Sequence, residues 1–298
     1  MILVIGDLIL DQIILSKSDK NSPEAPVPIL KPIEKKYFLG GAANVANNIK
    51  KFGEDVILIG VIDPNIFKST RILQKILKKN LIKNKLFKSK KFTPPLKKRI
   101  YCNNKMIARV DYEKKNFNNK FKEIFSYVKR NISKFSILIV SDYNKGTFNK
   151  NSYKKLINLF RKNKKITICN PKKNDISYYN GCDIIVPNEK EFNSFFSQKL
   201  NLKKKIKTFF VNNNQISNLI ITRGDKDVIY AHKHKIYSLK VKKINPKDVT
   251  GASDTFISIL GIFLKNKYSL KVAITKAILA SRIVINKKYT SYLKKKEL

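Results

Sequence analysis

The chain has 298 residues, 43% of them hydrophobic, and a formal net charge of +42 at pH 7. This length and hydrophobic content suffice for a sizeable core. The start has no basic leader before Asp7, and the longest apolar stretch, residues 256–264, is far below the ~20 residues that span a bilayer. Three widely spaced cysteines, Cys102, Cys169 and Cys182, form neither a C-x-x-C pair nor an even disulfide set. We therefore expect a cytoplasmic protein without a signal peptide or a membrane partner.

The positive charge raises nucleic acids and other polyanions as possible partners, because phosphate binding releases counterions. Most of the basic residues are Lys, and they accompany many Asn and Ile, a composition typical of A/T-rich coding sequence. Arg, with its bidentate fork, is the residue expected at specific base contacts. We interpret the charge as a solvated lysine surface and expect no nucleic-acid partner. A polyanion-binding protein remains an alternative, and it would gather basic residues on one face.

The first half of the chain begins with an apolar run that predicts a strand. Two later segments read as extended, partly alternating strands of a small antiparallel lid, with a turn at Asn103-Asn104. The stretch 83–98 combines paired prolines with dense charge and predicts a surface loop. In chain order, the predicted elements are a strand at 2–6, lid strands at 9–16 and 26–38, a helix at 41–52, a strand at 55–60, a helix at 65–79, the loop at 83–98, lid strands within 97–113, and a helix at 118–133.

The second half alternates short apolar runs with amphipathic stretches, as expected for a parallel sheet covered by helices. The predicted elements are a strand at 135–142, a helix at 150–163, strands at 165–170 and 183–188, a helix at 189–196, a strand at 218–224, and helices at 251–265 and 270–286. Most strands end in Gly, Asp or Asn. Because ligands bind beyond the carboxyl ends of parallel strands, these polar ends should line one crevice.

The stretch DVTGASD, residues 248–254, places small residues and an acid at the start of an apolar helix. Thr250 or Asp248 can cap this helix, whose first amide N–H groups converge on one point and form an anion hole. Asp254 could accept a proton from an attacking hydroxyl beside that hole, an arrangement suited to phosphoryl transfer. An Asp in the first turn of a helix is commonplace, so this stretch alone does not decide the function.

Other polar residues stand at similar positions. In GGAAN, Gly40 and Gly41 allow a ligand close to the backbone, and Asn44 offers both a donor and an acceptor to a sugar hydroxyl. Asn188 and Glu191 lie three residues apart, on one face of a helix start, and can hold Mg²⁺ through water. Taken singly, each has an ordinary structural explanation, such as a tight strand-to-helix connection.

Four stretches in order resemble the ribokinase-type (PfkB) sugar kinases, and the resemblance covers almost the whole chain. They are GD at 6–7, GGAAN at 40–44, N-x-x-E at 188–191 and DVTGASDT at 248–255. The resemblance implies an α/β fold, a ribokinase-like three-layer sandwich with a mostly parallel central sheet, helices on both faces and a small antiparallel β lid. It also implies a single kinase domain over residues 1–298.

Within this family, NSPEAPVPIL (21–30), SDYNKG (141–146) and NPKKND (170–175) are similar to the D-glycero-D-manno-heptose-7-phosphate kinases of lipopolysaccharide core synthesis. The implied reaction transfers the γ-phosphate of ATP to the anomeric hydroxyl of a heptose 7-phosphate. The implied cofactors are ATP and Mg²⁺, with a monovalent cation as a further candidate. The chain ends near residue 298 without the nucleotidyltransferase domain often fused to such kinases, so we expect a separate protein to adenylylate the product.

The resemblance also implies roles for individual residues. Asp254 would be the general base, beside an anion hole made by Gly251, Ala252, Ser253 and its own amide. The substrate side would comprise Asp7, Gly40, Gly41, Asn44, Lys98 or Arg99, Arg109, and, as weaker candidates, Asp142 and Lys145. The nucleotide side would comprise Lys172, Asn188, Thr222, Gly224, Gly251 and Ser253, with Asn188 and Glu191 organising Mg²⁺ through water.

Three positions depart from the family pattern. Ser253 stands where the family has a second glycine, Asn170 where it has Asp, and Asp227 where it has a glycine. Because of these departures, one alternative is that the chain is a degenerate homologue without catalytic activity. A kinase acting on another sugar or sugar phosphate is a second alternative, because the choice of epimer depends on a few hydrogen bonds.

The lid is also predicted to mediate self-association. An exposed ribbon has unpaired edges, and its apolar residues Ile13, Ile14, Ile29 and Ile100 require cover. We therefore expect a homodimer formed through the lid strands.

Overall fold

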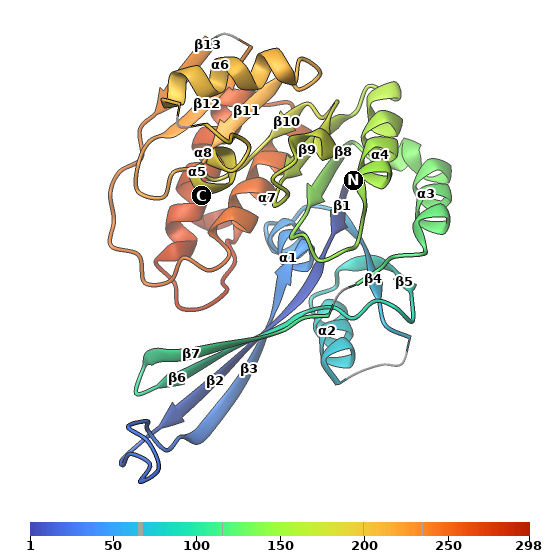
Figure 1. The fold of residues 1–298 in the computed structure, drawn as a ribbon. Helices are drawn as coiled ribbons and strands as arrows, with labels where there is room; N and C mark the ends of the chain where they lie inside the picture. The colour runs from blue at the N-terminus through green and yellow to red at the C-terminus, as the bar shows by residue number, and fades with distance from the viewer. Residues whose placement is uncertain (65–67, 115, 199, 234) are drawn as a thin grey trace.

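A computed structural model describes residues 1–64, 68–114, 116–198, 200–233 and 235–298. Its larger sheet has the strand order β13-β12-β11-β10-β9-β8-β1-β4-β5 (Figure 1). These strands are β1 (Ile2–Gly6), β4 (Val56–Ile62), β5 (Lys83–Lys88), β8 (Ile137–Ser141), β9 (Ile166–Asn170), β10 (Ile184–Ile185), β11 (Asn218–Ile221), β12 (Val228–His232) and β13 (Lys235–Leu239). All neighbours pair in parallel except β11–β12 and β12–β13. The mostly parallel sheet is therefore confirmed.

Helices cover both faces of this sheet (Figure 1). One face packs against α1 (Ala42–Lys51), α2 (Lys68–Lys79), α7 (Ala252–Lys265) and α8 (Leu270–Ile285), and the other against α3 (Phe121–Arg130), α4 (Lys150–Lys162), α5 (Glu189–Asn193) and α6 (Leu202–Asn212). Successive residues of β1 alternate between the two cores, as the period of a strand requires. Short 3₁₀ turns at Ile132–Lys134, Ile176–Tyr179 and Lys295–Glu297 complete the elements.

A glycine sets the close packing of α7 on the sheet. A Cβ added at Gly261 would lie 2.7 Å from the Ile139 Cδ1 atom of β8, so a larger residue would push the helix away. This contact places the first turn of α7 beside the carboxyl ends of the central strands.

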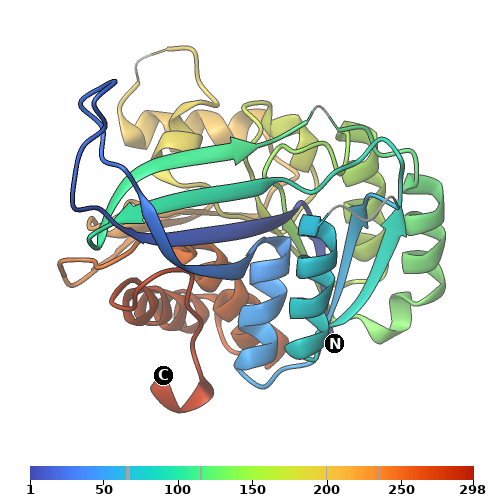
Figure 2. The same ribbon diagram turned by 90° about the horizontal axis from the view of Figure 1, so that it is seen from below.

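The second sheet is the predicted lid, with the order β3-β2-β6-β7. It comprises β2 (Leu8–Lys17), β3 (Lys31–Gly41), β6 (Leu96–Cys102) and β7 (Lys105–Tyr112). The pairs β2–β3 and β6–β7 are antiparallel, and the two pairs join along a parallel β2–β6 ladder. Figure 2 shows the four strands side by side. Asn103 and Asn104 have positive φ angles of 47° and 66°, which confirms the predicted turn.

The prediction of a surface loop at 83–98 was wrong. Residues 83–88 form the edge strand β5, and β6 begins at Leu96. The many lysines obscured a strand whose outer positions are solvated, while Phe87 and Phe92 are buried in the core. The helix α6, which packs on the sheet, and the β12–β13 hairpin, which extends the sheet at one edge, were not predicted at all. The first three residues of the helix expected at 65–79 lie outside the described residues.

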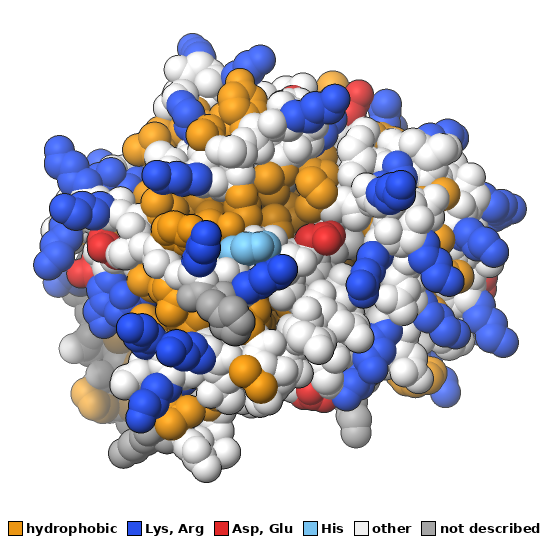
Figure 3. Space-filling view, turned by 90° about the horizontal axis from the view of Figure 1, so that it is seen from above, with side chains coloured by type: hydrophobic (Ala, Val, Ile, Leu, Met, Phe, Trp, Pro, Cys, Tyr) orange, Lys and Arg blue, Asp and Glu red, His pale blue; other side chains and the backbone are white. Residues whose placement is uncertain are grey.

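The surface carries basic side chains broadly. Figure 3 shows the face seen from above in Figure 1, with Lys and Arg along its upper, left and right edges and hydrophobic side chains gathered in a hollow near its centre. On this face the basic residues are dispersed, as expected for a solvated lysine coat. None of the helices in the described ranges is both long and apolar enough to cross a membrane. All three cysteines are buried with free thiols.

Candidate active site

The first turn of α7 presents unpaired amide groups. The helix starts from Gly251, which has a φ of 82° and no side-chain cap, so the expected cap by Thr250 or Asp248 was wrong. Asp248 instead accepts hydrogen bonds from the Thr250 and Tyr289 amides, at 2.8 and 3.1 Å. The Ala252 amide donates to Val249 O at 3.3 Å. The amides of Gly251, Ser253 and Asp254 have no acceptor among the described residues, which leaves them available to an anion.

Asp254 lies buried beside these amides. Its Oδ2 accepts a hydrogen bond from Asn44 Nδ2 at 2.8 Å, and its Oδ1 accepts one from the Tyr143 hydroxyl at 2.6 Å. Burial raises the pKa of Asp254 to about 6, although both hydrogen bonds and the Lys172 ammonium oppose that rise. At neutral pH the carboxylate is therefore mostly ionised yet basic enough to accept a proton.

Glycines bring the substrate-side segments close to Asp254. A Cβ at Gly40 would lie 2.5 Å from Asp11 Oδ2, and one at Gly41, where φ is 57°, would lie 2.4 Å from the Asp7 carbonyl oxygen. A Cβ at Gly251 would approach Asn44 Nδ2 to 3.0 Å. These positions require glycine because β2, the end of β3 and the start of α7 converge there.

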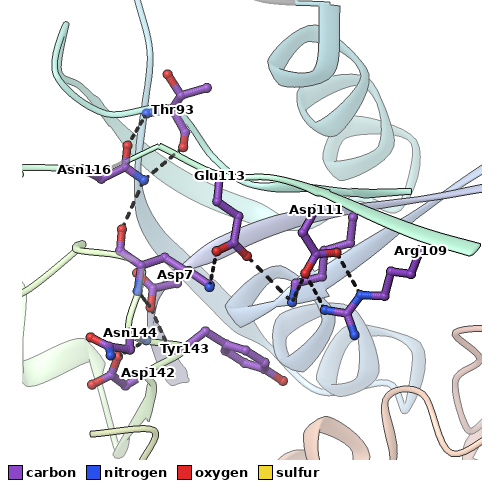
Figure 4. Close-up of polar contacts among 11 residues, drawn as sticks. Asp7, Thr93, Arg109, Asp111, Glu113, Asn116, Asp142, Tyr143 and Asn144 are labelled. Carbon is purple, nitrogen blue, oxygen red and sulfur yellow. Dashed lines mark hydrogen bonds and ion pairs between the residues drawn. The ribbon is translucent and has the colours of Figure 1, made fainter. Parts of the chain in front are cut away.

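The structure places Asp7 beneath a loop. Its Oδ2 accepts hydrogen bonds from the backbone amides of Tyr143 and Lys145, at 2.7 and 3.1 Å; Figure 4 shows Asp7 beside Tyr143. Its Oδ1 accepts a hydrogen bond from the Thr147 amide at 3.1 Å. Asp7 is almost fully buried. Its carboxylate therefore fixes the loop at 143–147, so its predicted contact with sugar hydroxyls competes with three protein hydrogen bonds.

Asp142 is also engaged within the protein. Its Oδ1 accepts a hydrogen bond from the Asn144 amide at 2.7 Å, and its Oδ2 accepts one from the Tyr179 hydroxyl at 2.6 Å. Burial and the neighbouring Asp7 carboxylate raise the pKa of Asp142 to about 6. The carboxylates of Asp7 and Asp142 are therefore both buried, and both hold the loop at 143–147 through hydrogen bonds to its backbone amides.

This raised pKa predicts how stability varies with pH. Between about pH 4 and 6 the folded state keeps a proton on Asp142 that the unfolded state has released, so this group's contribution to stability increases as pH falls through that window. Asp142→Asn, which resembles the protonated form, should raise the free energy of unfolding by about 2 kcal/mol at pH 7 and by little near pH 4. Urea denaturation at the two pH values measures this, and an equal gain at both would contradict it.

The lid contributes a cluster of charges on one face. Arg99 Nη1 pairs with Asp11 Oδ1 at 2.6 Å, and Arg109 makes a bidentate pair with Asp111 at 2.5 and 2.8 Å. Figure 4 shows Arg109, Asp111 and Glu113 in one network with the loop beyond β8. We define the lid cation cluster as Lys97, Arg99, Arg109 and Lys145.

The two lysines of this cluster meet at Glu113. Lys145 Nζ lies 2.5 Å from Glu113 Oε2, and Lys97 Nζ lies 4.0 Å from Glu113 Oε1 and 3.7 Å from Asp111. Burial and the nearby Arg109 and Lys145 lower the pKa of Lys97. An anion bound beside Lys97 would oppose this lowering, because it would stabilise the charged ammonium. Lys98 projects from the opposite face of β6, where it contacts the Tyr112 hydroxyl at 3.2 Å. Of these two candidates, Arg99 lies on the face that carries Asp11, and Lys98 lies on the opposite face; the binding role of either residue stays a prediction.

A cavity of about 330 Å³ lies at the start of α7, where Ser253 forms part of its wall. Of the predicted nucleotide residues, Thr222, Gly224 and Ser253 line it, together with Ala252. Most of the remaining wall is apolar, from Val228, Val241, Ile244, Val249, Phe256 and Ile278. A mostly apolar cavity beside a helix N-terminus could hold the base of a nucleotide whose phosphates reach the free amides.

Asn188, Glu191 and Lys172 form one group near this cavity. Asn188 and Glu191 make a reciprocal capping box at the start of α5, with hydrogen bonds of 2.8 Å in each direction, and Lys172 pairs with Glu191 Oε1. In the part of the chain that is described, no three acidic, His or Cys residues gather as a metal site. Both oxygens of the Glu191 carboxylate already accept hydrogen bonds from Asn188, so the hold of Asn188 and Glu191 on Mg²⁺ through water stays a prediction.

The three departures from the family pattern have distinct surroundings. Ser253 lines the cavity. Asn170 is buried at the end of β9, and neither polar atom of its side chain has a partner among the described residues. Asp227 accepts hydrogen bonds from the Ser238 hydroxyl and the Val241 amide, at 2.8 and 3.3 Å. Asp227 therefore shapes the cavity wall, while Asn170 keeps donor and acceptor capacity for a ligand or water.

Two residues in this site were not singled out from the sequence. Asp11 holds Arg99 and touches Gly40, and Tyr143 donates to Asp254. Asp11 lies in the predicted lid strand at 9–16, and Tyr143 lies within SDYNKG.

A comparison with protein families matches residues 1–297 to the pfkB family carbohydrate kinases. This chain belongs to that family. The pfkB kinase is 33% identical over 292 residues to the bifunctional protein HldE of Helicobacter pylori strain HPAG1, and 30% identical over 302 residues to HldE of Haemophilus ducreyi. These alignments cover 96% and 100% of the chain but 63% and 62% of the relatives, so the chain spans under two thirds of their length.

Solved structures with the same fold include phosphofructokinase-2 of Escherichia coli in complex with potassium and ribokinase of Thermotoga maritima. The first has a TM-score of 0.79 at 14% identity and covers 99% of this pfkB kinase and 96% of its own chain. The second has a TM-score of 0.75 at 20% identity and covers 99% and 97%. The ribokinase-like fold predicted from the motifs is thereby confirmed, and the chain is a phosphotransferase of the carbohydrate kinase type.

Proposed function

We propose that this pfkB kinase uses ATP to phosphorylate the anomeric hydroxyl of D-glycero-D-manno-heptose 7-phosphate, giving the 1,7-bisphosphate. The observation that carries the proposal is the position of Asp254, between free helix amides on one side and the sugar-side glycines on the other. The HldE relatives and the stretches SDYNKG and NPKKND support a heptose substrate.

The geometry supports a direct transfer. Asp254 accepts the proton of the attacking hydroxyl as that oxygen bonds to the γ-phosphorus and the bond to the β-phosphate oxygen breaks. The amides of Gly251, Ser253 and Asp254 stabilise the negative charge on the transferring group. Bound ATP would supply the phosphoryl group, and Mg²⁺ would neutralise charge on its phosphates. Glu191 would hold the Mg²⁺ through water.

A cofactor of a second kind is proposed for the turn before α7. A monovalent cation there would stabilise the conformation that exposes the amides. Asp248, the Thr290 hydroxyl and nearby carbonyl groups are the oxygen donors available. These oxygen donors suit a hard cation.

The lid cation cluster provides a place for the substrate's own phosphate. It contains four basic side chains, against the three carboxylates Asp11, Asp111 and Glu113. The closeness of Asp11 to Gly40 and its ion pair with Arg99 support a position for this cluster on the substrate side of Asp254. A sugar with a reactive hydroxyl at one end and a phosphate at the other fits this arrangement.

The test is turnover of ATP with a panel of sugars and sugar phosphates, including both heptose epimers and fructose 6-phosphate. We expect the highest kcat/KM with heptose 7-phosphate. Faster turnover of another sugar phosphate would replace the heptose with that sugar, and ATP binding without any turnover would favour a degenerate homologue.

The predicted homodimer also remains a proposal. Ile13 is already buried within the chain, so it cannot serve the interface as expected. The outer lid face instead offers the half-buried Ile14 and Ile100, with the exposed Val110 and Tyr112 beside them. We expect a dimeric mass by light scattering at micromolar concentration, and a monomeric mass for the double variant Ile100→Lys, Val110→Lys. A monomeric wild-type protein would refute the dimer.

A further inference from the structure

We propose that Tyr143 is a positioning residue for the phosphoryl transfer, whose hydroxyl holds Asp254 in its ionised, correctly oriented form. For its catalytic consequence the inference rests on the proposed function. Its physical basis, the interaction between the two side chains, does not depend on the identity of the sugar.

The carboxylate of Asp254 is held from two sides. The Tyr143 hydroxyl donates to Oδ1 at 2.6 Å, and Asn44 Nδ2 donates to Oδ2 at 2.8 Å. Asn44 is itself fixed, since Asn48 Nδ2 donates to its carbonyl and side-chain oxygens at 2.9 and 3.2 Å. Because a carboxylate oxygen accepts two hydrogen bonds, each Asp254 oxygen keeps a free site for the substrate hydroxyl. The two donors therefore orient the base without blocking it.

Tyr143 is held in place by its surroundings. Its backbone amide donates to Asp7 Oδ2 at 2.7 Å (Figure 4). That carboxylate also accepts hydrogen bonds from the amides of Lys145 and Thr147. The Lys172 ammonium lies 5.5 Å from the centre of the Tyr143 ring, within cation–π range. Lys172 is in turn paired with Glu191. The hydroxyl is thus aimed at Asp254 by contacts that do not themselves involve Asp254.

The groups around Asp254 determine the balance between its ionised and protonated forms, and the Tyr143 hydroxyl favours the ionised form. Burial disfavours the ionised carboxylate and Asp11 on β2 disfavours it further, whereas the Tyr143 and Asn44 hydrogen bonds and the Lys172 charge favour it. Tyr143 itself stays protonated, because burial and the Asp254 charge raise its pKa well above the ordinary value. It therefore serves as a constant donor across the working pH range.

The first test measures the base directly in the free protein. The carboxyl ¹³C signal of Asp254, identified by its absence in Asp254→Asn, is titrated in wild-type protein and in Tyr143→Phe. Loss of the hydrogen bond should raise the midpoint by about one pH unit. Tyr179→Phe is the matched control, because it removes an equally short hydrogen bond, from a buried tyrosine to Asp142. An unchanged midpoint in Tyr143→Phe, or an equal change in both variants, would overturn the inference.

The second test measures catalysis with heptose 7-phosphate. In Tyr143→Phe the acid limb of the kcat/KM profile should move to higher pH with the Asp254 midpoint. We expect kcat near neutral pH to fall about tenfold, with about twofold from the smaller ionised fraction of Asp254 and the rest from the lost orientation of its carboxylate. The KM for ATP should stay the same. An unmoved acid limb in an active Tyr143→Phe variant would contradict the positioning role. If wild-type protein turns over no heptose 7-phosphate, the proposed substrate fails, while the titration still decides whether Tyr143 tunes Asp254.

Discussion

Replacing Asp254 with asparagine is expected to lower kcat for the sugar phosphate by about 10²–10⁴-fold, because the amide keeps the shape of the carboxylate but cannot accept the proton. The same change should stabilise the fold by about 2 kcal/mol at pH 7, since Asp254 is ionised there although burial has raised its pKa to about 6. A loss of turnover accompanied by a gain in stability would distinguish the removal of a buried base from general damage.

Two measurements check this variant. Steady-state kinetics give kcat, and thermal denaturation at pH 7 gives the change in stability. Nucleotide affinity, measured by calorimetry, should change little, because the cavity residues and the amides of Gly251 and Ser253 remain in place. Near-normal turnover in Asp254→Asn would reject the assignment of the general base.

The double variant Lys97→Met, Lys145→Met should raise the KM for a phosphorylated sugar by about 10²-fold and change kcat much less. Each lysine is expected to contribute a charge-assisted hydrogen bond to the substrate phosphate, and such bonds contribute about 1.5–3 kcal/mol before solvent screening is considered. Methionine keeps the length and apolar stem of lysine. The effect should therefore reflect the lost charge rather than lost packing.

Lys98→Met is the matched control, since Lys98 lies on the neighbouring position of β6 but on the opposite face of the lid. It should leave the KM for the sugar phosphate close to the wild-type value. Steady-state kinetics with varied sugar phosphate at saturating ATP compare the two. Equal increases in KM in both variants would indicate a general electrostatic effect of the lid and not a phosphate site.

The sequence was sufficient to predict the alternating fold and the convergence of its motifs. Residues at a strand end or a helix start, such as Gly40, Asn44 and Asp254, occur in recognisable stretches, and the structure brings them together. The apolar runs of the central strands are long enough to be recognised even in a chain that is rich in lysine. The edge strand β5 was not recognised, because one solvated side and many lysines resemble a loop.

The role of individual side chains depended on contacts that the sequence does not contain. Tyr143 and Asp254 are 111 residues apart, and only the packing of α7 beside β8 brings them within hydrogen-bond distance. Lys98 and Arg99 are adjacent in the chain, so the register of β6 had to be known before one could be placed on the site face. Asp7 has the sequence context of a ligand residue, yet three backbone amides occupy its oxygens.

The burial of the three native cysteines has a practical consequence for measuring lid movement. Cys102, Cys169 and Cys182 are shielded inside the protein, so thiol-directed dyes should react with them slowly compared with cysteines introduced at the surface. One such cysteine can replace Lys105 at the tip of the β6–β7 turn, and another can replace the exposed Val211 on α6. Energy transfer between two dyes would then report the distance from the lid to the large sheet in an otherwise native protein.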